Sequence, residues 1–110
     1  MMRFPVICVP FLPMAGMALF PFILIKRSEY KGDQVLLNHE RIHIVQQLEL
    51  LLVGFYLLYF LNYLINLLKY KKHELAYLNI VFEKEAYRRE SETSYLKRRE
   101  IWAWRRFLSF

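Results

Sequence analysis

Cysteine is nearly absent from this chain, in which Cys8 is the only one among 110 residues. A small fold held together by disulfides is therefore excluded, because such folds need paired cysteines. Internal repeats and low-complexity stretches are also missing, and charged residues make up only 24% of the chain. The apolar fraction of 56% excludes a disordered chain, which would be poor in apolar residues. These properties predict one small folded domain over residues 1–110.

Charge is missing from the middle of the chain, where Glu49 is the only charged residue between Leu48 and Leu68. Residues 69–110 then hold eleven Lys/Arg and six acidic residues, a net charge of +5. A neutral apolar block followed by a basic, aromatic tail predicts contact with membrane lipid. The residues expected to anchor the tail at the lipid interface are Trp102, Trp104, Arg105 and Arg106. Nucleic-acid binding would explain the tail but not the apolar block, and is the less favoured interpretation.

A continuous helix is excluded from the apolar stretch 4–25, because it contains four prolines. The same prolines make this stretch a poor membrane span. Residues 17–20 and 22–25 are typical of extended strands, with Pro21 tolerated at a sheet edge. We therefore expect residues 1–34 to form an apolar strand or hairpin region.

Helical spacing of apolar residues begins at Val35, and Asp33 is expected to cap that first helix. Residues 35–70 are predicted to contain two helices, with a break near Gly54, since a glycine inside a helix costs about 1 kcal/mol. Residues 75–110 are predicted to hold a further helix over 76–99, followed by the basic tail. The expected fold class is mainly α, with a short N-terminal strand or hairpin.

One motif points to chemistry, because His39, Glu40 and His43 form H-E-x-x-H inside the first predicted helix. Residues four apart lie on one helix face, so both imidazoles can reach one metal ion. The carboxylate of Glu40 can then hold and deprotonate the attacking water. A zinc hydrolase site also needs a third protein ligand. The candidates are Cys8, His73 and, preferred among them, the acidic segment 82–87.

H-E-x-x-H followed by E-x-x-A on a later helix resembles the gluzincin arrangement of zinc metallopeptidases. More narrowly, the chain resembles short bacterial membrane proteins that pair HERIH with FEREAY, and distantly the integral-membrane CAAX-type proteases. The resemblance implies that Glu83 is the third zinc ligand and that Ala86 lets the two helices pack closely. Two positions depart from the clan's pattern, Arg41 inside the first motif and Tyr87 where an acid often follows the second.

The resemblance implies a zincin-like, membrane-associated domain with zinc as cofactor and a peptide or protein as substrate. In this clan the strand before the first motif binds the substrate main chain as an added strand. Here that segment would comprise Met17, Ala18, Leu19, Phe20, Phe22, Ile23, Leu24 and Ile25. The possible oxyanion donors are Tyr77, Tyr87 and His73, and the possible partners of the ligand imidazoles are Asn38, Gln46, Gln47 and Glu85.

A metal site and one straight spanning helix exclude each other in this sequence. In a straight helix over 36–70, His43 would lie about 40 Å from Tyr70, whereas Glu83 would return by only about 15 Å. A break between the two helices allows Glu83 to come level with the histidines. We therefore expect the break and a convergence of His39, His43 and Glu83.

Two functions of different class remain open. The first is a zinc-dependent peptidase at or in the bacterial inner membrane, in which Glu40 is the general base. The second is a non-catalytic helical membrane or adaptor protein with a structural or vestigial metal site. Cations flank the apolar block on both sides, with Lys26, Arg27 and Lys31 before it and Lys69, Lys71 and Lys72 after it. The larger excess of cations on the C-terminal side favours a cytoplasmic tail.

Overall fold

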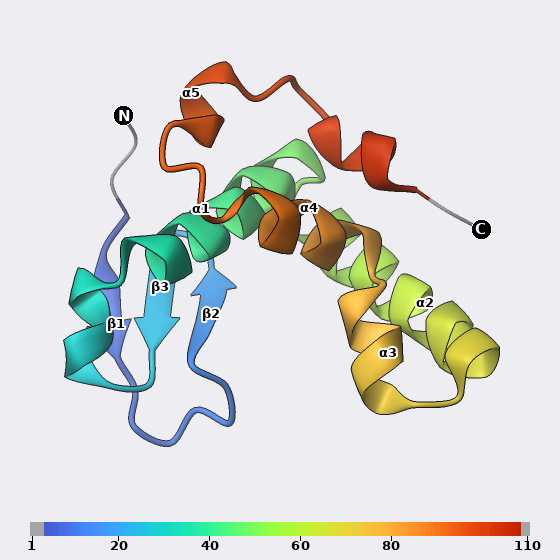
Figure 1. Cartoon of the computed structure of the whole chain (residues 1–110), viewed down its shortest axis with the longest axis horizontal. Helices are drawn as coiled ribbons and strands as arrows, with labels where there is room; N and C mark the ends of the chain where they lie inside the picture. Colours follow the sequence, from blue (N-terminus) through green and yellow to red (C-terminus); the bar gives the residue numbers. More distant parts are fainter. Residues whose placement is uncertain (1–3, 109–110) are drawn as a thin grey trace.

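The structure of this protein is a computed structural model that describes residues 4–108. The two ends of the expected domain, residues 1–3 and 109–110, lie outside the described residues. The described chain is mainly helical and carries one small sheet near its N-terminal end, as predicted (Figure 1).

The N-terminal apolar stretch forms a three-stranded sheet with the strand order β1-β3-β2. Strands β2 (Gly16–Leu19) and β3 (Phe22–Ile25) form the expected antiparallel hairpin. Strand β1 (Val6–Cys8) was not expected, because it is only three residues long and lies between prolines. It pairs parallel to β3, so β3 is the central strand and β2 is an edge strand.

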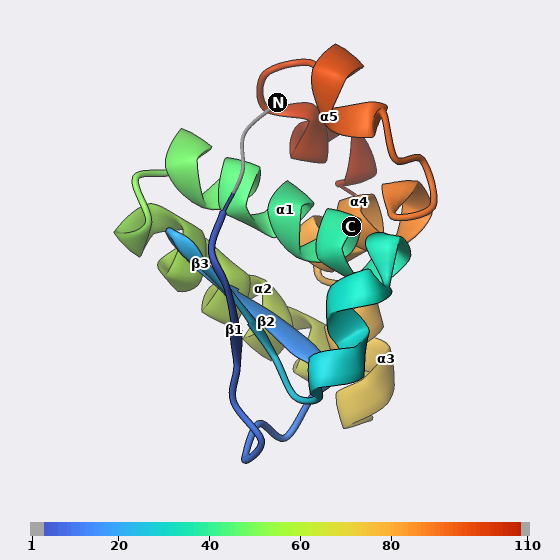
Figure 2. The same cartoon turned by 90° about the vertical axis from the view of Figure 1, so that its left-hand side faces the viewer.

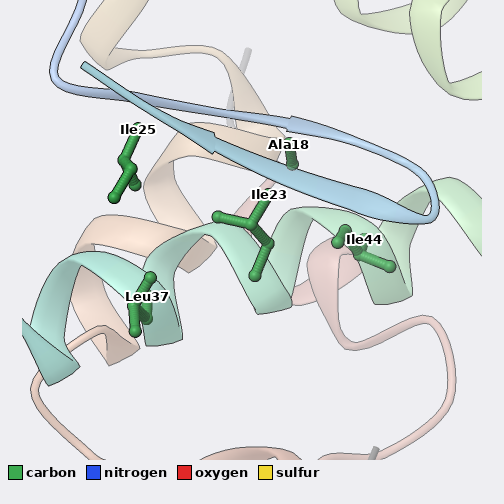
Figure 3. Close-up of a cluster of buried hydrophobic side chains, with 5 residues drawn as sticks. All are labelled: Ala18, Ile23, Ile25, Leu37 and Ile44. Atoms are coloured by element: carbon green, nitrogen blue, oxygen red, sulfur yellow. The ribbon is translucent and has the colours of Figure 1, made fainter. Parts of the chain in front are cut away.

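A 3-10 turn, η1 (Ser28–Gly32), leads into α1 (Gln34–Glu49), which covers one face of the sheet (Figure 2). The Oδ1 atom of Asp33 accepts a hydrogen bond from the backbone N–H of Leu36 at 3.0 Å, so the predicted N-cap is confirmed. Alternate residues of β3 point to the same side of the sheet. The core that results is shown in Figure 3 and comprises Ala18, Ile23, Ile25, Leu37 and Ile44.

The chain bends by 111° between α1 and α2 (Val53–Tyr70), which confirms the expected break. The break lies at residues 50–52, near Gly54 as expected, but Gly54 is not its cause, because it lies inside α2. Leu51 and Leu52 instead take positive φ angles of 56° and 62°. Such backbone is unfavourable for leucine and persists where surrounding contacts impose it. Here Phe55, at the start of α2, is buried against Phe82, so packing rather than glycine sets the bend.

Polar side chains of α2 point inward and hold the next two helices, α3 (His73–Leu78) and α4 (Val81–Arg89). Asn66 donates to the carbonyl of Ala76 at 3.1 Å, and Asn62 accepts from the N–H of Val81 at 2.8 Å. The second contact satisfies an N–H at the start of α4, which has no partner within the helix. The polar face of α2 is thus a packing face, and it fixes where α4 begins.

The predicted continuous helix over 76–99 is wrong, because the chain forms α3, α4 and α5 (Tyr95–Arg98) as separate helices. Ile80 has an extended backbone between α3 and α4, and the side chain of Asn62 accepts a hydrogen bond from the N–H of Val81, the first residue of α4. After α4, the side chain of Asn38 binds backbone carbonyls of residues 89, 90 and 92, which hold the chain in a loop. Contacts from distant residues therefore override the local helical preference.

The C-terminal tail ends in a 3-10 turn, η2 (Ala103–Phe107), which packs on α4. Trp104 is half-buried with its ring 5.3 Å from that of Phe82, so it belongs to the core rather than to an exposed anchor. Trp102 stays 45% exposed and stacks on Trp104. Arg105 and Arg106 are exposed.

No single helix within residues 4–108 has both the length and the apolar character needed to cross a bilayer. The bent pair α1 and α2 meets this condition together, on length and composition alone.

Candidate metal centre

The three predicted ligands converge between α1 and α4. Atom Oε1 of Glu83 lies 2.9 Å from Nε2 of His43 and 3.2 Å from Nε2 of His39. One ligand atom of each residue lies within 4.8 Å of the other two, and all three side chains are buried. Two imidazoles and a carboxylate at this separation can hold a metal ion. Close packing of the two helices, with Ala86 buried against Ile42, makes this convergence possible.

The other two candidates for the third ligand lie elsewhere. Cys8 is exposed on β1, and its thiol contacts the carbonyl of Lys26. His73 begins α3, where its Nδ1 atom lies 2.8 Å from the hydroxyl of Tyr63. Within residues 4–108 the only group of this kind able to hold a metal ion is His39, His43 and Glu83.

Each ligand has a hydrogen-bond partner of its own. Nδ1 of His39 lies 2.7 Å from Oε2 of Glu90, and Nδ1 of His43 lies 2.8 Å from Oε1 of Gln46. The hydroxyl of Tyr59 donates to Oε2 of Glu83 at 2.6 Å. These contacts leave Nε2 of both imidazoles and Oε1 of Glu83 facing one another. Partners of this kind orient metal ligands and raise their basicity.

A buried charge network continues behind His43. Nε2 of Gln46 donates to Oε1 of Glu85 at 2.8 Å. Glu85 is fully buried and pairs with Arg99 at 2.5 Å, and the same guanidinium binds both carboxylate oxygens of Glu49 at 2.9 Å. Since a buried charge without a partner is costly, this arrangement holds α1, α4 and the tail in one geometry.

The remaining predicted partners support the site without touching a ligand. Asn38 donates to the carbonyls of Glu90 and Glu92 at 2.9 and 3.0 Å, and so positions the loop that carries Glu90. Gln47 donates to the carbonyl of Ala18 at 3.0 Å and accepts from the N–H of Phe20 at 3.1 Å. Gln47 therefore fixes the hairpin against α1.

The imidazole of His43 and the carboxylate of Glu83 shift each other's pKa in opposite directions. Burial alone would lower the pKa of His43, but the carboxylate of Glu83 raises it to about 9. Burial would likewise raise the pKa of Glu83, but the two imidazoles hold it well below its usual range. A cation that binds here has to displace the proton from His43.

Glu40 differs from the other buried acids because no described residue forms a hydrogen bond or ion pair with its carboxylate. Burial raises its pKa, although the nearby imidazoles of His43 and His39 act in the opposite direction. A Cβ atom added to Gly16 would lie 3.2 Å from Oε2 of Glu40, so this carboxylate faces the backbone of β2. A carboxyl group with a raised pKa and no partner suits reversible proton transfer.

The structure corrects the extent of the expected substrate strand. Phe22, Ile23, Leu24 and Ile25 form β3, which is paired on both sides and has no free edge. Phe20 lies in the hairpin turn. Of the expected substrate residues, only Met17, Ala18 and Leu19 lie on a strand with a free outer edge, β2.

Part of that outer edge is already in use. The carbonyl of Ala18 accepts hydrogen bonds from Gln47 at 3.0 Å and from Tyr56 at 3.3 Å. The carbonyl of Ala15 accepts a hydrogen bond from the N–H of Lys26, which directly follows β3. Because inward and outward peptide groups alternate along an antiparallel strand, the N–H and C=O groups of Gly16 face outward. The accessible portion of the edge is therefore next to Glu40.

Two of the three proposed oxyanion donors lie close to the ligands. The ring of Tyr87 lies 4.5 Å from that of His39, and the hydroxyls of Tyr77 and Tyr87 are 3.0 Å apart. Burial raises the pKa of both hydroxyls, so they remain protonated donors at neutral pH. His73 contacts this pair only through its stacking on Tyr77.

Three residues of the site were not anticipated as functional. Glu90 lies seven residues after Glu83, two turns along the same helix face, and this spacing could have indicated it. Tyr59 lies on the inward, polar face of α2, together with Asn62 and Asn66, which bind the following helices. Arg99 carries no local signal, since its partners are 14 and 50 residues away.

No family model matches this chain, and neither a curated protein nor a solved structure matches it.

Proposed function

We propose that this protein is a zinc-dependent peptidase of the gluzincin arrangement that acts at a membrane surface. The observation that carries the proposal is the buried cluster of His39, His43 and Glu83 beside the unpartnered carboxylate of Glu40. Three protein ligands, rather than four, are typical of catalytic zinc sites, which keep one position open.

The donor set fits zinc, which binds imidazole nitrogen and carboxylate oxygen. The open Nε2 atoms and Oε1 of Glu83 would hold the ion, while Glu90, Gln46 and Tyr59 orient them. When bound, zinc would supply Lewis acidity that makes a water nucleophilic near neutral pH.

Glu40 would act as the general base and then as the general acid. Its carboxylate takes a proton from the attacking water and passes it to the leaving amine of the cleaved peptide bond. The substrate main chain would lie along the outer edge of β2 at Gly16, within reach of this carboxylate. Of the hydrogen-bonded hydroxyls of Tyr77 and Tyr87, the one that accepts from the other keeps its own proton free and would donate it to the oxyanion that develops on the carbonyl.

The decisive experiment separates catalysis from metal binding. Glu40→Gln should keep one equivalent of zinc, since Glu40 is not a ligand, but should lower peptidase activity by about 10²–10⁴-fold. Glu83→Gln should lower both zinc content and activity, because a neutral oxygen replaces a charged ligand. Zinc content by atomic absorption and hydrolysis of a peptide library provide the two measurements.

Other outcomes would lead to different conclusions. Activity unchanged in Glu40→Gln would show that the hydrolysis comes from another source. Stoichiometric zinc without hydrolysis of any peptide would favour the alternative, a non-catalytic membrane or adaptor protein with a structural metal site. A folded protein that binds no zinc would reject both metal-based functions.

Membrane association is supported by the outward face of α2. Its polar side chains point inward, whereas its outward face is apolar and continuous, as for a helix that contacts lipid. The exposed side chains are Leu57, Leu58, Phe60, Leu61, Leu64, Ile65 and Leu68. The cations Lys69, Lys71 and Lys72 follow directly and would meet anionic headgroups.

Vesicle flotation tests this contact. Phe60→Ser with Ile65→Ser should reduce binding to phosphatidylglycerol vesicles, because it removes two exposed apolar side chains from the middle of this face. Phe11→Ser is the control, since Phe11 is apolar and 87% exposed but lies in the turn between β1 and β2, outside α2 and the tail. Equal binding by the wild type and the double variant would reject lipid contact through α2.

A further inference from the structure

A second candidate site lies away from the ligand cluster, between the first half of α1 and the segment that leads into α5. It is a cavity of about 270 Å³ lined by Gln34, Asn38, Arg41, Thr93, Ser94 and Lys97. Its volume is just below the range of about 300–1,000 Å³ that is typical of small-molecule sites. In both cartoon views α5 lies over α1, on the side opposite α2 (Figures 1 and 2).

The lining of this cavity is cationic and contains no acidic residue. Arg41 and Lys97 form no ion pair with any residue of the described chain, 4–108. Nε of Arg41 is buried without a hydrogen-bond acceptor in the same part of the chain. The charge of this guanidinium is therefore uncompensated, and an oxyanion in the cavity beside it would compensate that charge.

The wall that faces Arg41 is held in place. The amide of Asn38 donates to the carbonyls of Glu90 and Glu92, immediately before Thr93 and Ser94. Glu92, the acid next to Thr93 in the sequence, pairs with Arg89 and Arg98, so its charge is compensated outside the lining. Thr93 and Ser94 therefore line the same cavity as two cations that have no ion-pair partner in the described chain.

The larger cavity of the molecule, about 730 Å³ between α4 and the tail, is also rich in arginine. Four of its six cations are already in ion pairs, because Arg99 pairs with Glu49 and Glu85, Arg106 pairs with Glu100, and Arg89 and Arg98 pair with Glu92. An anion there would compete with existing ion pairs. The smaller cavity has no such competition, and this difference decides between them.

We propose that the cavity around Arg41 and Lys97 binds a phosphate group. Two cations match the charge of a phosphate monoester, and the hydroxyls of Thr93 and Ser94 add donors from a second direction. The proposal does not depend on the peptidase function. It gives a role to Arg41, which departs from the usual residue at that position of the motif and lines this cavity instead of contacting the ligands.

Titration of the wild-type protein with inorganic phosphate, monitored by two-dimensional NMR and by calorimetry, tests the proposal. Saturable binding should shift the amide signals of Thr93 and Ser94. Arg41→Gln and Lys97→Gln should each weaken binding by about tenfold or more, the effect of losing one charged hydrogen-bond partner. Lys31→Gln, which removes one exposed cation from η1, is the matched control and should bind as the wild type does.

The same variants distinguish the sources of the phosphate group. Binding of free phosphate that depends on Arg41 supports the site with a soluble phosphorylated ligand. Binding that depends on Arg41 and occurs only on vesicles of phosphatidylcholine with phosphatidic acid supports it with a lipid headgroup. Phosphate that binds only through the metal ligands would be lost in His43→Ala and retained in Arg41→Gln, and would overturn the proposal. No saturable binding in either form, or an equal effect of Lys31→Gln, would also overturn it.

Discussion

Zinc binding should be strongly coupled to pH, because a proton and the metal ion compete for His43. With a pKa of about 9, His43 is protonated at neutral pH in the metal-free protein. Binding at pH 7 should therefore release about one proton from this residue. The apparent affinity should rise about tenfold from pH 7 to pH 8 and about 50-fold from pH 7 to pH 9, and level off above that.

Competition with a chromophoric chelator at several pH values measures this affinity. Calorimetry in two buffers of different ionisation enthalpy counts the released protons independently. Glu83→Gln should bind zinc more weakly and with little change between pH 7 and 9, since the charge that raises the pKa of His43 is gone. Glu29→Gln, an exposed change on η1, should behave like the wild type.

An affinity of the wild type that stays constant between pH 7 and 9 would refute the reasoning. So would an equally steep pH dependence in Glu83→Gln, because the proton would then be held by something other than the contact at 2.9 Å.

Three further outcomes follow from the same network. Glu90→Gln should weaken zinc binding by about 10–100-fold through loss of the partner of His39, whereas Glu100→Gln, an exposed acid, should not; equal affinities in a chelator competition would contradict this. Arg99→Met should lower the free energy of unfolding by about 3–5 kcal/mol, because Glu85 and Glu49 lose their buried partner. Arg98→Met, which removes an exposed ion pair, should lower it by about 1 kcal/mol or less, and urea denaturation of both variants measures the difference. The raised pKa of His43 should stabilise the metal-free protein by at most about 3 kcal/mol below pH 6.5, and this contribution should disappear as pH rises through 9. The free energy of unfolding of the wild type should therefore fall more over this range than that of Glu83→Gln, and an equal or smaller fall would contradict the prediction.

Local sequence signals were sufficient for several parts of this protein. The four-residue spacing of His39 and His43 places both imidazoles on one face of α1 wherever that helix lies. The prolines of the N-terminal stretch excluded a helix, and the structure has the hairpin there. The geometric conflict between a straight helix and a metal site required a bend, and the chain bends by 111°.

Other features were beyond the reach of such signals. The bend falls at Leu51 and Leu52 rather than at Gly54, because packing of Phe55 against Phe82 outweighs the cost of two leucines with positive φ. The expected helix over 76–99 is divided where side chains of Asn62 and Asn38 bind its backbone. Both choices depend on residues that are distant in the sequence.

The sequence by itself thus determined the spacing of His39 and His43 on one helix face and the mainly helical class, because these follow from the periodicity of neighbouring residues. Only the tertiary structure decided which acids act on which histidines. Glu90 reaches His39 across 51 residues, and Arg99 reaches Glu49 across 50. Hydrogen bonds and buried ion pairs require contact within about 3 Å. Which distant groups meet at that range depends on how the helices pack, and no local pattern in the chain records it.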